Sequence, residues 1–164
     1  MTVNNAKQLF VFMLSDVRRG AELSNKFFRE LIKLAQDNDV KEALEARIFF
    51  SDKIIETLDK CFELVDEKPQ PVGVKLYDAF VENFRREFSE IQLPSVRRLF
   101  ILSKISALIH LRIGEYVALI ATADCTGHYN VGVLLESCLA DHLAFVERTR
   151  RLIRDQIREL VASA

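Results

Sequence analysis

The chain has 164 residues, 49% hydrophobic and 29% charged, and its 23 basic and 24 acidic residues leave a formal net charge of −1, which excludes a general attraction to nucleic acid. Its three cysteines form no CxxC pair, which argues against a disulfide framework or a thiolate zinc site and favours free, buried thiols. The length suits one domain over residues 1–164, and because we find neither a signal-peptide pattern nor an uncharged apolar run of about 18 residues, we expect a cytoplasmic protein that does not span a membrane.

Long helices are predicted because the chain contains only five glycines and three prolines to interrupt them. The first helix is expected over residues 5–36, where apolar side chains recur every three or four positions. Asn38 and Asp39 break this pattern, and Asp39 with Glu42 has the spacing of a capping box. The second helix should therefore begin at Asp39 and run to about Asp66.

The middle of the chain is predicted to hold a connection and a shorter helix. Residues 67–73 contain two prolines and a glycine and are expected to form the connection. The helix expected over residues 75–89 has an apolar edge formed by Leu76, Phe80, Phe84 and Phe88.

Two further long helices complete the predicted fold. Pro94 suits the first turn of a helix that runs to about Thr122, because its missing N–H would be unpaired there anyway. This helix is apolar on nearly every side, so we expect it in the centre of a bundle. Gly127 marks the next break, and the last helix is expected over residues 129–161. Its second half, rich in arginine and acidic residues, is predicted to be a solvated face, with an anionic-ligand site as the alternative.

These elements predict an all-α fold of four long helices and one short helix. A ferritin-like bundle describes this arrangement as well as any other bundle does. Periodicity alone does not choose among bundles.

Three stretches of the sequence resemble one particular family of helical bundles. They are Leu9-Phe10 with Leu14-Ser15-Asp16, the run KEALEARIFFSDKIIETLDKCFELVDEKP over residues 41–69, and IHLRIGEY (109–116) followed after Gly127 by LLESCL (134–139). In order and spacing they resemble the YciE/YciF-type ferritin-like family, bacterial proteins associated with stress responses, over nearly the whole chain. The resemblance implies a four-helix core with an extra helix, a homodimer, and a central cluster of carboxylates and histidines suited to two metal ions.

This chain departs from the metal-binding pattern on every core helix, so the resemblance implies a divergent member with degenerate di-iron ligands. The ligand positions fall on Ala21, Phe49, Phe50, Asp52, Ile109, His110, Arg112, Ala140, Asp141 and His142, with Leu111 at the spacer position of the Glu-His-x-Glu pattern. Only Asp52, Asp141 and His142 remain near the expected centre as donors. We therefore predict no catalytic residue, cofactor or metal. The alternative is a residual iron or manganese site built from Asp52, His110, Asp141 and His142.

Arg112 is the most informative of these positions, because its neighbours along the helix are apolar. A cation there needs a partner to offset its desolvation, so we predict a charge pair in the core with Asp141 or Asp52. The alternative is that Arg112 extends to the surface over a packed stem. His110 is expected to hydrogen-bond at the edge of the bundle, and His128 to end a turn.

Three functions follow from these observations. The first, which we expect, is a non-catalytic, stress-associated scaffold or interaction protein that forms a homodimer, with Phe80, Phe84 and Phe88 as candidate exposed contacts. The second is an iron- or manganese-binding ferritin-like oxidoreductase that uses the residual site. The third is a binding module for a small apolar ligand in the centre, which Phe49, Phe50 and Ile109 would line or fill.

Overall fold

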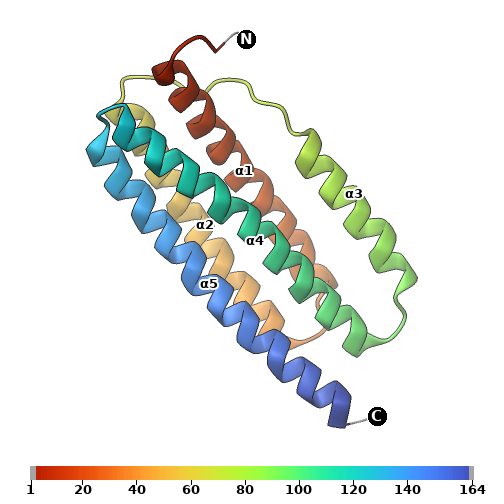
Figure 1. Cartoon of the computed structure of the whole chain (residues 1–164). Helices are drawn as coiled ribbons and strands as arrows, with labels where there is room; N and C mark the ends of the chain where they lie inside the picture. The colour runs from red at the N-terminus through yellow and green to blue at the C-terminus, as the bar shows by residue number, and fades with distance from the viewer. Residues whose placement is uncertain (1–2, 163–164) are drawn as a thin grey trace.

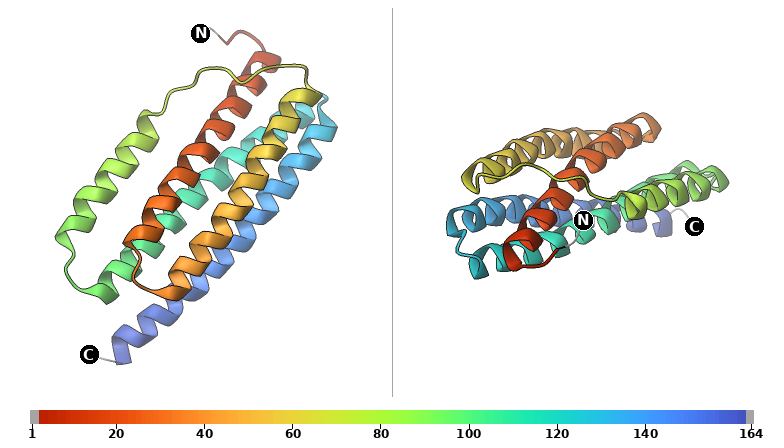
Figure 2. Two further views of the ribbon diagram at one scale, coloured as in Figure 1. Left: turned by 180° about the vertical axis from the view of Figure 1, so that it is seen from behind. Right: turned by 90° about the horizontal axis from the view of Figure 1, so that it is seen from above.

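Five helices make up the protein in a computed structural model that describes residues 3–162 (Figure 1). They are α1 (Ala6–Leu34), α2 (Asn38–Leu64), α3 (Lys75–Glu90), α4 (Pro94–Cys125) and α5 (Tyr129–Ala162). Helices α1, α2, α4 and α5 form an elongated four-helix bundle. Helix α3 lies outside it, beside α1 and α4 (Figure 2). The predicted all-α fold of four long helices and one short helix is confirmed.

The connections explain the order of the helices in the bundle. A short segment joins the antiparallel pair α1 and α2, and a tight turn joins the antiparallel pair α4 and α5 (Figure 1). Between the two pairs, the segment after α2 crosses over one end of the bundle and α3 returns the chain to the other end (Figure 2). One long crossover of this kind is typical of ferritin-like bundles.

Local signals set most of the helix ends. Pro94 stands in the first turn of α4, as predicted. At the end of α4, Gly127 has a φ of 79°, and the N–H groups of Gly127 and His128 donate to the carbonyls of Asp124 and Ala123. This is a Schellman motif, which places glycine where a side chain would be strained. The break predicted at Gly127 is therefore confirmed.

The predicted N-cap of α2 is wrong by two residues. Asp37, not Asp39, caps the helix: its side chain accepts a hydrogen bond from the Val40 N–H at 3.1 Å. The backbone of Asp37 is still extended, whereas Asp39 already lies in the first helical turn. There its carboxylate faces the positive end of the helix dipole without capping it.

Two predictions about buried faces also need correction. On α3, Leu76 is 67% exposed, and the buried face consists of Tyr77, Val81, Phe84 and Phe88. The spacing of that face fits one side of a helix, and Leu76 lies about 100° away from Tyr77. Helix α4 is not buried all round: Leu111 and Val117 are exposed on its outer side. By length and composition alone α4 could cross a membrane, but here it packs against α1 and α5.

The core consists of two hydrophobic clusters, one toward each end of the bundle. The upper cluster, at the end where the chain begins in Figure 1, includes Phe10, Leu14, Leu58, Leu119 and Leu135. The lower cluster, toward the opposite end, includes Phe28, Leu44, Phe84, Ile105 and Phe145. All three cysteines are free; Cys61 and Cys138 are buried, but Cys125 is exposed.

Candidate functional site

A layer of buried polar side chains separates the two hydrophobic clusters at mid-length of the bundle. We call this set the central polar layer; it consists of Ser24 on α1, Arg47 and Ser51 on α2, Arg112 on α4 and His142 on α5. Together with Val17, Ala21, Ile54 and Tyr116 they line a cavity of about 10 Å³. All four helices of the bundle contribute to it. The layer occupies the place where the sequence resemblance implies metal ligands.

Arg47 and His142 form the hydrogen bond at the heart of the layer. The His142 Nδ1 lies 2.7 Å from the carbonyl oxygen of Cys138 and therefore carries the proton, which it donates to that carbonyl. Its Nε2 is then free to accept from Arg47 Nη2 at 3.0 Å. Burial, reinforced by the charge of Arg47, lowers the pKa of His142 to about 3. The imidazole is thus a neutral acceptor at physiological pH.

Arg47 is a buried cation that forms no ion pair within residues 3–162. Only 3% of the residue is exposed, and its guanidinium carbon lies 5.3 Å from the centre of the Phe145 ring and 5.9 Å from that of Phe28. Within residues 3–162, its Nε and Nη1 have no hydrogen-bond partner. Burial lowers the pKa of Arg47 to about 10, against the attraction of Asp141 among others. It therefore keeps its proton at neutral pH.

Arg112 is buried as predicted, but its predicted partners are wrong. The Nη1 of Arg112 lies 2.7 Å from the Glu115 carboxylate, one turn further along the same helix. The guanidinium rests on Gly20 of α1, where an added Cβ would lie 1.7 Å from Nη1. Burial, with a contribution from Asp16, raises the pKa of Glu115 to about 7 against the opposing effect of Arg112. The local pair fits because residues three apart share one helix face.

Within residues 3–162, neither Asp52 nor Asp141 forms an ion pair with Arg112. Asp52 is on the exposed side of α2, where it accepts from Asn25 Nδ2 at 2.5 Å and pairs with Arg29 at 3.4 Å. Asp141 is half-buried. It precedes His142, and adjacent helical residues point about 100° apart, so only the histidine reaches the centre.

The four residues proposed as a residual metal site do not come together. His110 is exposed, and its Nδ1 lies 2.7 Å from the Ser106 carbonyl of its own helix; this confirms the predicted edge role of His110. Asp52 is exposed, and of the four only His142 lines the central cavity. Across residues 3–162, no group of three or more His, Cys, Asp or Glu side chains could hold a metal ion.

The predicted aromatic lining of the centre is wrong. Phe49 is 57% exposed and Phe50 is 41% exposed, and their rings contact each other outside the bundle. Ile109 is buried, but in the lower cluster. The inward positions of α2 are Arg47 and Ser51, two and one residues before the predicted ones at Phe49 and Asp52. A central pocket lined by Phe49, Phe50 and Ile109 is therefore excluded.

Sequence reasoning missed Arg47, although a signal was present. The buried residues of α2 recur at the spacing of one helix face, and Arg47 lies within that series, between Leu44 and Ser51. A cation inside an apolar series indicates a buried charge. Matching the chain to a metal-binding pattern drew attention to the neighbouring positions instead.

The central polar layer does not fit a pair of metal ions. A carboxylate-bridged di-iron or di-manganese centre draws Glu and His ligands from four helices. Here two helices contribute a guanidinium and α1 contributes only Val17, Ala21 and Ser24, so His142 is the only common metal ligand lining the cavity, and its free nitrogen accepts from Arg47. Two buried positive charges would also repel a divalent cation.

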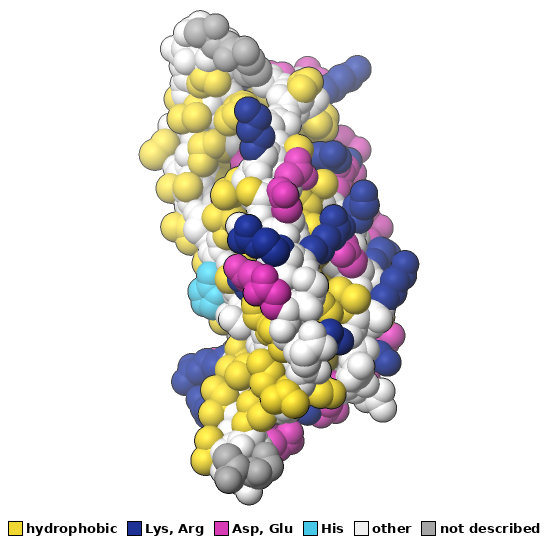
Figure 3. Space-filling view, turned by 90° about the vertical axis from the view of Figure 1, so that its right-hand side faces the viewer, with side chains coloured by type: hydrophobic (Ala, Val, Ile, Leu, Met, Phe, Trp, Pro, Cys, Tyr) yellow, Lys and Arg dark blue, Asp and Glu magenta, His cyan; other side chains and the backbone are white. Residues whose placement is uncertain are grey.

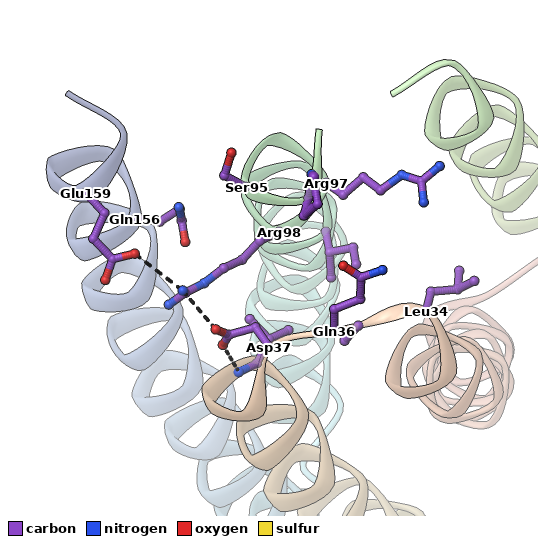
Figure 4. Close-up of a pocket in the computed structure, with 12 residues that line it drawn as sticks. Leu34, Gln36, Asp37, Ser95, Arg97, Arg98, Gln156 and Glu159 are labelled. Atoms are coloured by element: carbon purple, nitrogen blue, oxygen red, sulfur yellow. Dashed lines mark hydrogen bonds and ion pairs between the residues drawn. The ribbon is translucent and has the colours of Figure 1, made fainter. Parts of the chain in front are cut away.

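A second cavity, of about 300 Å³, lies at the lower end of the bundle where α5, α4 and the α1–α2 connection meet (Figure 4). Arg98 points into it between Asp37, at 2.9 Å, and Glu159, at 3.5 Å. Acidic side chains thus balance its charge. From the arginine-rich half of α5, only Gln156 and Glu159 line this cavity, so the arginines of that half take no part in it.

Comparisons with known proteins place these features in context. A family profile described as "Domain of unknown function (DUF892)" matches residues 5–162. No curated protein sequence matches the chain.

Three solved structures share the fold. The stress protein YciF from E. coli matches with a TM-score of 0.89 at 18% identity, covering 95% of this chain and 99% of that one. YcfI from Rhodopseudomonas palustris, described as a candidate structural protein, matches with a TM-score of 0.86 at 24% identity, covering 90% and 94%. A protein from Xanthomonas campestris pv. campestris matches with a TM-score of 0.73 at 18% identity, covering 96% and 95%.

Proposed function

Because the chain belongs to the DUF892 family, whose function is unknown, we propose a function from the chemistry of its centre: a non-catalytic, ferritin-like scaffold or interaction protein, associated with stress, that works in the cytoplasm without a di-iron centre. The observation that carries this proposal is the hydrogen bond between Arg47 and His142. It places a permanent cation against the one imidazole of the cavity.

The names of two structural relatives support the same direction. YciF is called a stress protein, and YcfI is described as a candidate structural protein. Neither name implies a reaction. The alternative of an iron- or manganese-dependent oxidoreductase loses its support, since Asp52, His110 and Asp141 lie outside the centre that His142 lines.

Elemental analysis tests the proposal most directly. The protein is purified aerobically without chelators and passed through gel filtration, and its iron and manganese content and ferroxidase and peroxidase turnover are measured. We expect metal far below one ion per chain and turnover no faster than buffer. About two ions per chain, lost in a His142→Ala variant but retained in a His110→Ala variant, would overturn the proposal.

We further propose that the scaffold is a homodimer that pairs through the outer face of α4. The side chains of α3 that were predicted to be exposed dimer contacts are not exposed: Phe84 and Phe88 are buried and Phe80 is half-buried. In Figure 3, acidic and basic side chains mix across the middle and right of the visible face, whereas hydrophobic side chains gather along its left edge and toward its lower end. The outer face of α4 differs, since Leu111, Gly114, Val117, Ala118 and Ala121 are exposed there in succession.

The dimensions of α4 suit such an interface. A helix of 32 residues is roughly 48 Å long, and its small residues permit close approach of a second copy. A stable interface would bury on the order of 1,200 Å² in total. Light scattering should give the mass of a dimer at micromolar concentration. Val117→Arg should give a monomer, and Leu76→Arg, on the exposed side of α3, should remain a dimer. A monomeric wild-type protein would defeat this part of the proposal.

A further inference from the structure

The central polar layer contains more positive than negative charge. Arg47 and Arg112 are 3% and 6% exposed, and His142 is neutral because it accepts from Arg47. The only ion pair to either arginine within residues 3–162 is that between Arg112 and Glu115, a carboxylate at the edge of the layer with 21% of its side chain exposed. A buried cation without a counter-charge is strongly destabilising. Arg47 is thus left, within residues 3–162, with only the attraction of the more distant Asp141 to offset its charge, and the layer favours a further negative charge beside it.

Of the five polar atoms on cavity-lining residues that are unpaired within residues 3–162, three are guanidinium N–H donors and two are the hydroxyls of Ser24 and Tyr116. Arg47 Nε and Nη1 and Arg112 Nε are buried without a partner, and so is the hydroxyl of Ser24. All three residues line the same cavity. Guanidinium nitrogens donate and do not accept. A water molecule here would find acceptors in the hydroxyl oxygens of Ser24, Ser51 and Tyr116, but it would bring no negative charge to balance the buried guanidinium groups.

We propose that this cavity binds one small monovalent anion, of which chloride is the simplest, held between Arg47 and Arg112 with the Ser24 hydroxyl as a further donor. The anion takes the place that metal ions hold in the resemblance. The charge relation is inverted: cationic side chains surround an anion, where carboxylates would surround cations.

The size of the cavity limits the ligand to a single small particle. Its volume of about 10 Å³ is close to what one water-sized particle requires. Sulfate and phosphate are too large to enter. The walls can adjust slightly for a halide, since arginine and serine side chains border it, whereas Val17 and Ile54 close the apolar sides.

Thermal unfolding in matched salts is the first test. The melting temperature is measured in sodium chloride and in sodium gluconate at constant ionic strength, with chloride varied from about 1 mM to 0.3 M. A ligand that binds only the folded state stabilises it logarithmically, so above the dissociation constant we expect Tm to rise by roughly 3–5 °C for each tenfold increase in chloride. A melting temperature that is independent of the anion would overturn the proposal.

Two arginine variants locate the effect. Arg47→Met replaces the buried cation by an apolar chain of similar length and should abolish the chloride dependence. Arg148→Met, on the exposed side of α5, should keep it in full. Equal chloride dependence in both variants would show a general salt effect and overturn the proposal.

Bromide provides a readout that does not depend on the folding of a variant. Crystals of the wild-type protein grown in bromide should give an anomalous peak in the central cavity, bordered by Arg47 and Arg112. No anomalous signal at that position would overturn the proposal. A peak without any chloride effect on unfolding would show an adventitious ion only and would also overturn it. The inference does not rest on the proposed function, because metal analysis and halide binding can succeed or fail separately.

Discussion

The two hydrophobic clusters and the central polar layer occupy the same bundle but are stabilised in opposite ways. Each cluster gains stability from every apolar side chain that it removes from water, with little regard to direction. The layer gains only where a buried donor meets an acceptor, and it loses stability wherever one does not. The clusters therefore hold the helices together, whereas the layer determines what the centre can bind.

The largest expected difference is between a buried and an exposed leucine of α2. Leu58 is fully buried in the upper cluster, and Leu64 is exposed on the same helix. Leu58→Ala should lower the free energy of unfolding by about 2–5 kcal/mol, because it removes buried methyl groups and leaves a cavity. Leu64→Ala should change it by less than about 0.5 kcal/mol. Urea unfolding measures both, and similar losses would contradict the assignment of the cluster.

The layer should show its own signature in the dependence of stability on pH. The pKa of His142 is lowered to about 3 in the folded state, so on acidification the unfolded state takes up a proton first. His142 therefore makes the free energy of unfolding fall as the pH drops below about 6.5. The folded-state pKa of Glu115 is raised from 4.5 to about 7, so Glu115 stabilises the fold at low pH and this stability is lost as pH rises through that range. Between about pH 4.5 and 6.5 the two effects oppose each other.

Glu115→Gln should unmask the histidine. The stability of this variant should rise with pH by up to about 1.4 kcal/mol per unit between pH 4.5 and 6.5, whereas the wild type should change much less. Glu136→Gln, at an exposed position of α5, serves as the matched control and should follow the wild type. Urea unfolding at a series of pH values measures the slopes. Parallel slopes for the two glutamine variants would show that Glu115 does not titrate as the structure indicates.

Gly20 tests how closely α1 approaches the layer. In Gly20→Ala the new methyl group would meet Arg112 Nη1 at 1.7 Å, so the guanidinium must move and its bond to Glu115 is disturbed. We expect a loss of about 1–3 kcal/mol. In the background of Arg112→Met, which removes the obstructing group, Gly20→Ala should be nearly neutral. If the losses of the two single variants simply add in the double variant, the effect of Gly20→Ala does not act through Arg112.

The smallest effect concerns the start of α2, which lies outside the layer. Asp37→Ala removes the N-cap hydrogen bond to Val40 and should cost about 1 kcal/mol or slightly more, since Asp37 also pairs with Arg98. Asp39→Ala should cost less, because Asp39 makes no capping hydrogen bond and its contact with Arg98, at 4.0 Å, is longer than that of Asp37. Thermal unfolding of the two variants shows which aspartate caps the helix. A larger loss for Asp39→Ala would support Asp39 as the N-cap, as predicted from the sequence.

Much of the fold was accessible from sequence because its signals are local. The scarcity of glycine and proline, the position of Pro94 and the break at Gly127 led to all five helices with ends close to those observed. The site was accessible only in part. Arg112 was recognised as a buried cation, but Arg47 was missed, and Phe49 and Phe50 were placed inside although they lie outside. A two-residue displacement on a helix rotates a side chain by about 200°, enough to exchange the core for solvent.

The amino-acid sequence by itself determined that this chain forms five helices and that Arg112 lies on an apolar side of one of them, because capping, helix breaking and periodicity act between neighbours in the chain. Tertiary structure alone decided which residues meet at the centre. Arg47 and His142 are 95 positions apart, and Arg112 reaches its place only because Gly20 of another helix leaves room for it. Such contacts depend on the rotation and approach of whole helices, which packing sets to within an ångström.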